Sequence, residues 1–408
     1  MVEIWFPYGS SEVPLRVPDE NLIDILKPRD SKQSQSETNL EQLITEEIVA
    51  EAKHAGQICL VIGSTRRKEL LVNTTRSLLN TLAGAGISRS KITIMTTPQS
   101  NSMDELTELQ TVQHSPSTSP TAACEGFSGD FVPLLNTAIT NSQFSIAIGE
   151  LLPHHLTGYT GLSDLIFPGL ASEKSAREEL IRNKPMDPRE LHNERLGVTS
   201  LLRKVYALGY VLNGDLSVAN ASFGPFNETV NRLSQVVNDV AKVEATRAAD
   251  IVIMSAGGMP LDETLLRAVE SFPAGLSILK RNGALIVAAE CLRGHGDSDF
   301  FDWSNEHKEP RYLEARLRRR FNYYGWKAAY LMRTLATHRV YLVSTIPDHH
   351  VEHTFGLRAA KTMNAALQSA QRAIGADASI TVIPNASQVI PHVSGGTPEI
   401  PQHVKTQT

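Results

Sequence analysis

The hydrophobic positions of the chain form short continuous runs that alternate with longer segments of helical spacing. Runs such as residues 58–62 and 144–148 contain hardly any polar position. This is typical of strands covered on both faces of a sheet. Helical segments between such runs predict right-handed βαβ units. Because the pattern restarts near residue 248, we predict the α/β fold class, with two α/β domains, mostly parallel sheets, a helical hinge and an active-site cleft between the domains.

The predicted elements fix the expected domain boundaries. We predict an N-terminal domain over residues 1–247, a C-terminal α/β domain over residues 248–395 and a tail over residues 396–408. The predicted strands are residues 58–62, 92–97, 144–148, 210–213, 216–218, 250–255, 284–289, 340–344 and 380–383. The predicted helices are residues 40–54, 68–83, 132–141, 172–182, 197–208, 228–248, 262–271, 273–281, 309–319, 327–335 and 356–374. Residues 183–196 are expected to be a charged connector.

Composition narrows the class of protein without identifying it. The chain has 408 residues and a formal net charge of −5 with no evident basic face, so a nucleic-acid partner is not expected. No apolar run approaches membrane-spanning length, and the start of the chain lacks the basic region of a signal peptide. The cysteines form no C-x-x-C pair, so no zinc ribbon or disulfide framework is indicated. We therefore expect a cytoplasmic protein with no membrane partner, and its oligomeric state stays open.

The most informative stretch is residues 153–169, which follows the predicted strand at residues 144–148. Two histidines, His154 and His155, stand near its start, and Gly158 and Gly161 frame a turn that carries hydroxyl groups. Backbone N–H groups of a small-residue turn at a strand end, together with imidazoles, suit an anionic small molecule or a nucleotide phosphate. An ordinary strand-to-helix turn with solvated histidines explains the same residues, and both interpretations stay open on chemistry alone.

This stretch resembles the signature of the nickel-pincer lactate racemase family. That signature reads His-x-x-x-Gly, an aromatic residue, Ser or Thr, and Gly-Gly-x-Lys, and it runs into Pro-Gly. The matching residues are His154, Gly158, Tyr159, Thr160, Gly161, Pro168 and Gly169. Leu162 stands where the family has a second glycine, and Asp164 stands where it has the lysine that anchors its cofactor covalently. The resemblance extends from about residue 4 to residue 393.

Two further segments of the predicted N-terminal domain carry the same resemblance. Thr65 and Arg66 match two positions of the family's Asp-x-Thr-Arg-Pro motif, in which the arginine faces substrate or cofactor. Gln99 falls in the segment that supplies one of the family's two catalytic histidines. The amide of Gln99 can donate a hydrogen bond to a hydroxyl group but cannot take its proton.

The predicted C-terminal domain is similar to the family at three places. Residues 257–262 resemble its Gly-Gly-x-Pro-x-Asp segment. On the helix that follows, Arg267 and Glu270 stand where the family has glutamine and lysine. Residues 290–296 resemble its Glu-Cys-x-x-Gly-x-Gly loop, with His295 between the two glycines.

The resemblance implies a racemase or epimerase that acts on a small 2-hydroxy acid or sugar acid by hydride and proton transfer at C2. It implies a nickel-pincer nucleotide as the cofactor and His154 as a metal ligand; without that nucleotide no cofactor is expected. The candidate catalytic residues are His154, Asp164 and Arg66. The candidate cofactor-binding residues are Thr65, Arg66, Gly158, Thr160, Gly161, Asp164, Gly257 and Gly258. The candidate substrate-binding residues are Gln99, Tyr159, Arg267, Glu270 and His295.

Two other functions stay open at this point. The first is a divergent relative that binds a nucleotide or sugar acid and carries out nickel-independent chemistry, since a carboxylate beside a histidine can abstract a proton. The second is a catalytically silent ligand-binding protein. In each case the expected partner is a small hydroxy acid or a nucleotide-like ligand. Two other histidines, His114 and His192, are predicted to be solvated surface residues.

Overall fold

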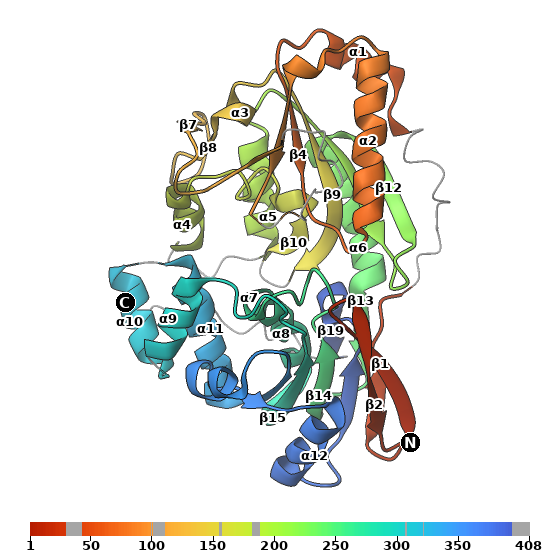
Figure 1. The fold of residues 1–408 in the computed structure, drawn as a ribbon, viewed down its shortest axis with the longest axis vertical. Coiled ribbons are helices and arrows are strands. Elements are labelled where there is room, and N and C mark those ends of the chain that lie inside the picture. Colours follow the sequence, from red (N-terminus) through yellow and green to blue (C-terminus); the bar gives the residue numbers. More distant parts are fainter. Residues whose placement is uncertain are drawn as a thin grey trace. The chain divides into compact units, whose positions relative to one another are not determined.

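The computed structural model describes residues 1–29, 43–98, 100, 111–154, 157–181, 188–306, 308–320 and 322–393. These residues divide into two compact units, both drawn in Figure 1. One, which we call the His154 unit, comprises the described residues up to Val240 except the first 29. The other, the Gly257 unit, comprises Met1–Arg29 together with the described chain from Ala241 onward. Helices and mostly parallel sheets make up both units, which confirms the predicted α/β fold class.

The His154 unit is built around a sheet with the strand order β12-β11-β9-β4-β5-β6. Neighbouring strands from β11 to β6 are parallel, whereas β12 pairs antiparallel with β11, and β10 pairs antiparallel with β9. Its strands are β4 (Ile58–Ile62), β5 (Ile92–Thr96), β6 (Thr111–Gln113), β7 (Thr121–Ala123), β8 (Leu134–Asn136), β9 (Phe144–His154), β10 (Gly158–Gly161), β11 (Lys204–Leu212) and β12 (Val218–Pro225). Its helices are α1 (Glu46–Lys53), α2 (Lys68–Gly84), η3 (Arg89–Lys91), α3 (Thr137–Thr140), η5 (Leu162–Asp164), α4 (Glu173–Ile181), α5 (Pro188–Thr199) and α6 (Phe226–Ala241).

Both faces of this sheet are covered, which explains why its central strands are continuously apolar. Helix α2 lays Leu71 and Leu78 against the buried side chains of β4 and β9, and it lies beside the sheet in Figure 1. The segment after β10 lies very close to the sheet: a Cβ at Gly63, the residue after β4, would lie 2.8 Å from Leu165, and one at Gly209 of β11 would lie 2.3 Å from Leu162. Leu162, which departs from the family signature, is thus a fully buried packing residue.

The Gly257 unit has a second parallel sheet, with the strand order β17-β16-β15-β14-β18-β3. Alternate residues of β14 face different cores: Val252 and Met254 belong to one cluster, Ile251 and Ile253 to the other. Its strands are β1 (Val2–Tyr8), β2 (Ser11–Val17), β3 (Leu22–Ile25), β13 (Lys242–Ala245), β14 (Ala249–Ser255), β15 (Leu279–Ala288), β16 (Arg339–Val343), β17 (Arg358–Ala359), β18 (Ile380–Ile383) and β19 (Ile390–Val393). Its helices are α7 (Leu265–Ala268), η6 (Val269–Ser271), α8 (Phe272–Leu276), α9 (Ser298–Glu306), α10 (Pro310–Arg319), α11 (Tyr323–Thr337), η7 (His350–Thr354), α12 (Met363–Ile374) and η8 (Ala386–Gln388).

The N-terminal residues differ from the predicted domain division. We expected residues 1–247 to form one domain, but Met1–Arg29 belong to the Gly257 unit. The physical reason is strand pairing: β3 extends the second sheet by pairing in parallel with β18, and Phe6 and Leu15 of the β1–β2 hairpin are fully buried in that unit's core. The predicted tail at residues 396–408 lies outside the described residues.

Several predicted elements were wrong in kind. The helix predicted at residues 132–141 is strand β8 followed by the short helix α3, and the charged connector predicted at residues 183–196 contains most of α5. The helix predicted at residues 197–208 ends as strand β11, because pairing with both β9 and β12 outweighs the helical spacing of its apolar residues. By contrast, the strands predicted at residues 58–62 and 380–383 have those bounds.

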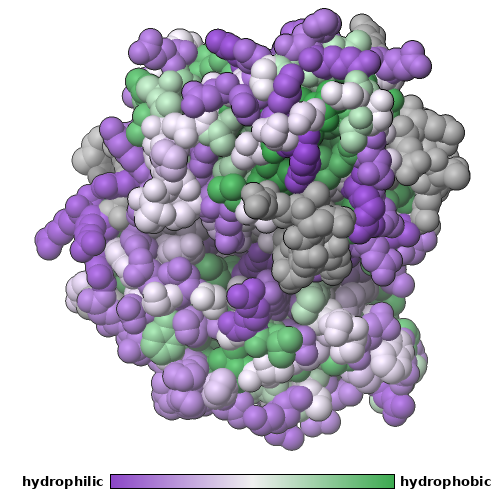
Figure 2. Space-filling model, turned by 45° about the horizontal axis from the view of Figure 1, so that its top comes forward, coloured by the Kyte–Doolittle hydropathy of each residue, from purple (hydrophilic) through white to green (hydrophobic). Residues whose placement is uncertain are grey.

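The distribution of hydrophobic residues on the surface is that of a protein whose apolar side chains are mostly buried. On the face drawn in Figure 2, hydrophobic residues occur in small separate groups among hydrophilic ones. Within the described ranges no helix combines the length and the hydrophobicity that crossing a membrane requires.

Candidate active site

The signature residues form a β-hairpin. Strand β9 continues to His154, well past the predicted end at residue 148, and β10 folds back along it so that Gly158 pairs with His154 and Gly161 with Leu151. Gly161 has φ +79°, and a Cβ there would lie 2.3 Å from the carbonyl oxygen of Glu150, so this return requires glycine. The turn expected from Gly158 to Gly161 is therefore wrong, since these residues form a strand.

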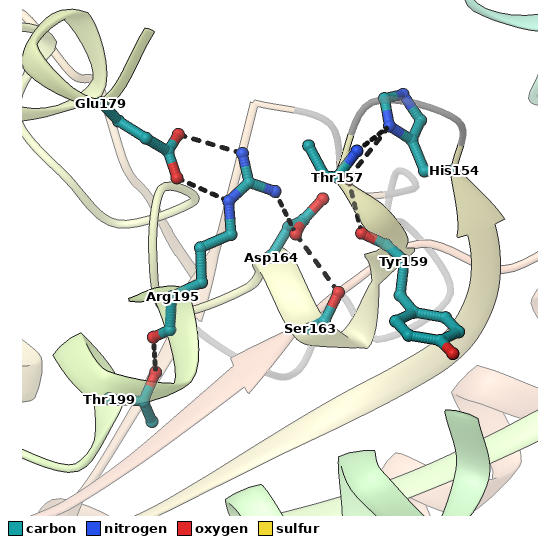
Figure 3. A network of polar contacts seen from close by, with 8 residues as sticks. All are labelled: His154, Thr157, Tyr159, Ser163, Asp164, Glu179, Arg195 and Thr199. Carbon is teal, nitrogen blue, oxygen red and sulfur yellow. Dashed lines mark hydrogen bonds and ion pairs between the residues drawn. The ribbon is translucent and has the colours of Figure 1, made fainter. Parts of the chain in front are cut away.

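A chain of hydrogen bonds holds His154, as Figure 3 shows. The Thr157 hydroxyl lies 2.7 Å from the carbonyl oxygen of Tyr159 and 3.0 Å from Nδ1 of His154. The Thr157 amide also donates to Nδ1 of His154, at 3.3 Å. Because a backbone amide can only donate, Nδ1 of the neutral ring is an acceptor here. Thr157 therefore orients the imidazole through two contacts to one ring nitrogen.

Asp164 is tied into a buried ion-pair network. Its Oδ1 lies 2.6 Å from Nη1 of Arg195, and Glu179 binds the same guanidinium through two bonds of 2.6 and 2.9 Å. The side chains of Arg195 and Glu179 are 5% and 1% exposed, and that of Asp164 is 23% exposed. Burial alone would lower the pKa of Arg195, but the charges of Asp164 and Glu179 outweigh it and raise that pKa. Figure 3 shows Arg195 reaching from α5 toward both carboxylates.

Arg66 is held in a second buried network, at the ends of three strands. Its Nε lies 2.7 Å from Glu150 on β9, its Nη2 donates to the carbonyl of Leu212, and its Nη1 donates to that of Asn213. The other carboxylate oxygen of Glu150 accepts from the Arg66 amide and the Thr65 hydroxyl. The Arg66 and Glu150 side chains are 4% and 0% exposed. The resemblance implies that Arg66 faces substrate or cofactor; in the structure its charge is paired with Glu150 inside the protein.

His192 was predicted to be a surface residue, and this is wrong. It lies on α5, is 6% exposed, and has its ring edge-to-face with Tyr159 at 4.9 Å between ring centroids. Tyr159 in turn accepts a hydrogen bond of 2.7 Å from Asn238 of α6. Neither ring nitrogen of His192 has a hydrogen-bond partner in the described structure. Burial lowers the pKa of His192, with Asp164 opposing this effect and Arg195 adding to it.

His114 was also predicted to be solvated, and it too is buried. Its Nε2 lies 2.9 Å from the carbonyl of Ala171, and its Nδ1 accepts from the Asn136 amide at 3.0 Å. Burial lowers the pKa of His114, so the ring is a neutral structural group. It joins the end of β6 to the segment after the signature.

In the Gly257 unit, the glycines of the Gly-Gly-x-Pro-x-Asp segment make room for the N-terminal hairpin. A Cβ on Gly258 would lie 3.0 Å from the carbonyl oxygen of Gly9, and the amide of Gly9 donates to Asp262 at 2.7 Å. The same Asp262 oxygen accepts from the amide of Glu290 at 3.0 Å. Gly257, which adopts φ +117°, donates its amide to the Ser255 hydroxyl. Close packing against the N-terminal hairpin therefore accounts for Gly258 and Asp262 without any ligand.

The predicted substrate-binding residues of the Gly257 unit each contact protein groups. Arg267 donates to the carbonyl of Pro260 at 3.0 Å. Glu270 lies 2.8 Å from the ammonium group of Lys327, whose side chain is 5% exposed. His295 contacts the carbonyl of Asp297 through Nδ1 and packs its ring on Phe301. These groups belong to the Gly257 unit, whereas the signature hairpin belongs to the His154 unit.

The structure brings together only part of the predicted site. In the His154 unit, Gly158, Tyr159, Thr160 and Gly161 share the hairpin with His154, and Asp164 follows it directly. Thr65 and Arg66 belong to the separate Glu150 network. Gln99 lies outside the described residues. Within the described residues, no three or more His, Cys, Asp or Glu side chains form a group that could hold a metal ion.

Sequence reasoning missed Glu150, Arg195 and Glu179. Glu150 had a usable signal, because a lone acid inside an otherwise apolar strand is fully buried only when it is paired. No sequence signal pointed to Arg195, because it lies 31 residues from Asp164 and 16 from Glu179, on a helix that was not predicted.

The fold and the hairpin define a class of two-unit α/β proteins with a histidine at the end of a central parallel strand. Residues 8–182 match the model of the lactate racemase N-terminal domain, and residues 243–391 match that of the lactate racemase C-terminal domain. The chain therefore belongs to the lactate racemase family.

Two relatives and two solved structures show the degree of similarity. The chain is 28% identical over 274 residues to the lactate racemase of Thermoanaerobacterium thermosaccharolyticum, and 24% identical over 270 residues to that of Lactiplantibacillus plantarum. Each match spans 63% of this chain and 63% of the relative. The lactate racemase apoprotein structure from T. thermosaccharolyticum has a TM-score of 0.80 at 23% identity, covering 96% of this chain and all of that chain. A Thermotoga maritima protein has a TM-score of 0.63 at 13% identity, covering 89% and 100%.

Proposed function

We propose that the protein is a racemase or epimerase that inverts the configuration at C2 of a small 2-hydroxy acid or sugar acid. Membership of the lactate racemase family supports the reaction class. The observation that carries the proposal is the position of His154, which ends a central strand of the signature hairpin and is held by Thr157. Nickel-independent chemistry and a silent ligand-binding role are not favoured by the family relationship.

The step that falls to this chain's own side chains is movement of the C2 hydroxyl proton. The imidazole of His154 accepts that proton and later returns it. Thr157 acts as a positioning residue, because its amide and its hydroxyl both contact Nδ1 of His154 and so orient the ring. The ligand in this proposal is a small hydroxy acid or nucleotide-like molecule.

The family's nickel-pincer nucleotide does not fit the anchoring position of this chain. Asp164 has no amine with which to form the covalent link, and its carboxylate already binds Arg195. We therefore derive no step through that group. The proposal includes hydride transfer at C2 only if the cofactor binds without a covalent link to a lysine.

The test is to express the full chain beside the family's cofactor-synthesis enzymes. The purified protein is then incubated with single enantiomers of lactate and of a panel of 2-hydroxy and sugar acids. Chiral chromatography should show inversion at C2 of at least one acid, with a reduction of at least about 100-fold in the His154→Gln variant, in line with loss of a general base.

Thr157 offers the matched control for this experiment. Thr157→Ser keeps the hydroxyl and should retain activity, whereas Thr157→Val removes it and should shift the pH–rate profile as well as lower the rate. Absence of inversion across the whole panel, or equal activity in the His154→Gln variant, would contradict the proposal.

A further inference from the structure

The network around Asp164 occupies the position of the family's cofactor anchor. We infer that the covalent cofactor anchor of the family is replaced in this chain by a structural ion-pair network of Asp164, Arg195 and Glu179, so that this position forms no covalent link to a nucleotide cofactor. The inference rests on the proposed function for the class of cofactor. The structural role of the network is independent of it.

The network joins three separate segments through one guanidinium. Asp164 ends η5, Glu179 lies on α4, and Arg195 lies on α5. The three contacts between them measure 2.6, 2.6 and 2.9 Å, and Glu179 engages Arg195 through both carboxylate oxygens. Charge-assisted, bidentate contacts of this length are among the strongest polar interactions in proteins. Asp164 is therefore a packing partner of Arg195 rather than a replaceable surface group.

The chemistry at this position excludes the family's link. A lysine forms its covalent bond through the lone pair of a neutral amine, and aspartate has no such nitrogen. A bond from the Asp164 carboxylate would need a co-reactant to activate it, and it would also remove the negative charge that Arg195 faces.

The residues around Asp164 also disfavour a lysine at this position. An ammonium group in place of the Asp164 carboxylate would face the buried guanidinium of Arg195 across a contact that is now 2.6 Å. Like charges at such distances repel strongly where water is excluded. The rest of the site is thus built for a negative charge at this position.

The experiment compares the full-length wild-type chain with three variants, all co-expressed with the family's cofactor-synthesis enzymes. Asp164→Lys introduces the repulsion, and Asp164→Asn removes the charge while keeping the shape. Glu178→Lys is the matched control, because Glu178 lies next to Glu179 on α4 and makes only an exposed 4.0 Å pair with Lys174. Intact mass under denaturing conditions and the midpoint of thermal unfolding are measured for each protein.

All four proteins should have the mass of the unmodified chain. The unfolding midpoint should fall by about 8 °C or more for Asp164→Lys, by about 2–4 °C for Asp164→Asn, and by no more than about 1 °C for Glu178→Lys. A nucleotide adduct on the wild-type chain would overturn the inference. So would an Asp164→Lys variant that gains the adduct while keeping the wild-type midpoint.

These readouts separate this inference from the proposed function. An unmodified wild-type chain with a destabilised Asp164→Lys variant supports the inference whether or not any hydroxy acid is racemised. Racemisation by a wild-type chain that carries the adduct would support the proposed function and overturn the inference.

Discussion

The two buried arginines of the His154 unit differ in how their charge is balanced. Arg66 pairs with the single carboxylate of Glu150, and backbone carbonyls of Leu212 and Asn213 complete its contacts. Arg195 instead faces the two carboxylates of Asp164 and Glu179. The first network is electrically balanced, whereas the second carries one excess negative charge.

The difference teaches which parts of the site keep the family pattern and which have changed. Arg66 occupies a position that matches a family motif, and its partners are strand ends of the sheet itself. Arg195 connects η5, α4 and α5, the segments around the one position where the family's lysine is missing. Arg66, which matches the family motif, is bound by strand ends of the sheet. Asp164, which replaces the family's lysine, is bound by Arg195 of α5.

The largest effect should come from removing the cation that serves two anions. Arg195→Met leaves Asp164 and the buried Glu179 without their cation, and breaking a buried pair costs about 3–5 kcal/mol, so we expect the upper end of that range or more. Urea unfolding followed by circular dichroism measures it. Arg177→Met, an exposed position on α4, is the control. A loss below about 1 kcal/mol would show that the network does not hold these helices.

A somewhat smaller loss is expected for Arg66→Met, about 3–4 kcal/mol, because only Glu150 is left as an uncompensated buried charge. Adding Glu150→Gln to this variant removes that charge and should recover part of the loss. The same urea titration applies, with Arg76→Met on the exposed side of α2 as the control. If the double variant is no more stable than Arg66→Met, the Arg66–Glu150 pair is not the dominant interaction.

The smallest effect tests how far the Arg195 network reaches. The negative charge of Asp164 raises the pKa of His192 against the larger effect of burial, so Asp164→Asn should lower that pKa further. His114 contacts Asn136 and Ala171 instead and serves as the internal reference. An NMR titration of the histidine ring signals measures both, and equal shifts of the two rings would contradict a local effect.

The same ring predicts the sign of a pH effect on stability. Unfolded His192 binds a proton near pH 6.5, while the folded ring, whose pKa is lowered, stays neutral until lower pH. The free energy of unfolding should therefore fall as the pH drops below about 6.5, by at most about 1.4 kcal/mol per pH unit for this group. Asp164→Asn should extend this loss to lower pH.

The sequence predicted the fold better than it predicted the site. Continuous apolar runs identified β4 and β18 because strands covered on both faces leave no polar alternation to misread. The signature located His154 and its hairpin partners, but it could not show that β9 continues to His154. Arg195 and His192 could not be assigned, because only tertiary packing brings α5 against the hairpin.

The pairing of β3 with β18 has a consequence for synthesis of the chain. Leu22 is translated 358 residues before its partner Ile380. At about 5–20 residues per second, the interval between them is about 20–70 seconds. Over that time β3 has no β18 with which to pair. The two segments of the Gly257 unit are therefore made at separate times, with the His154 unit made in between.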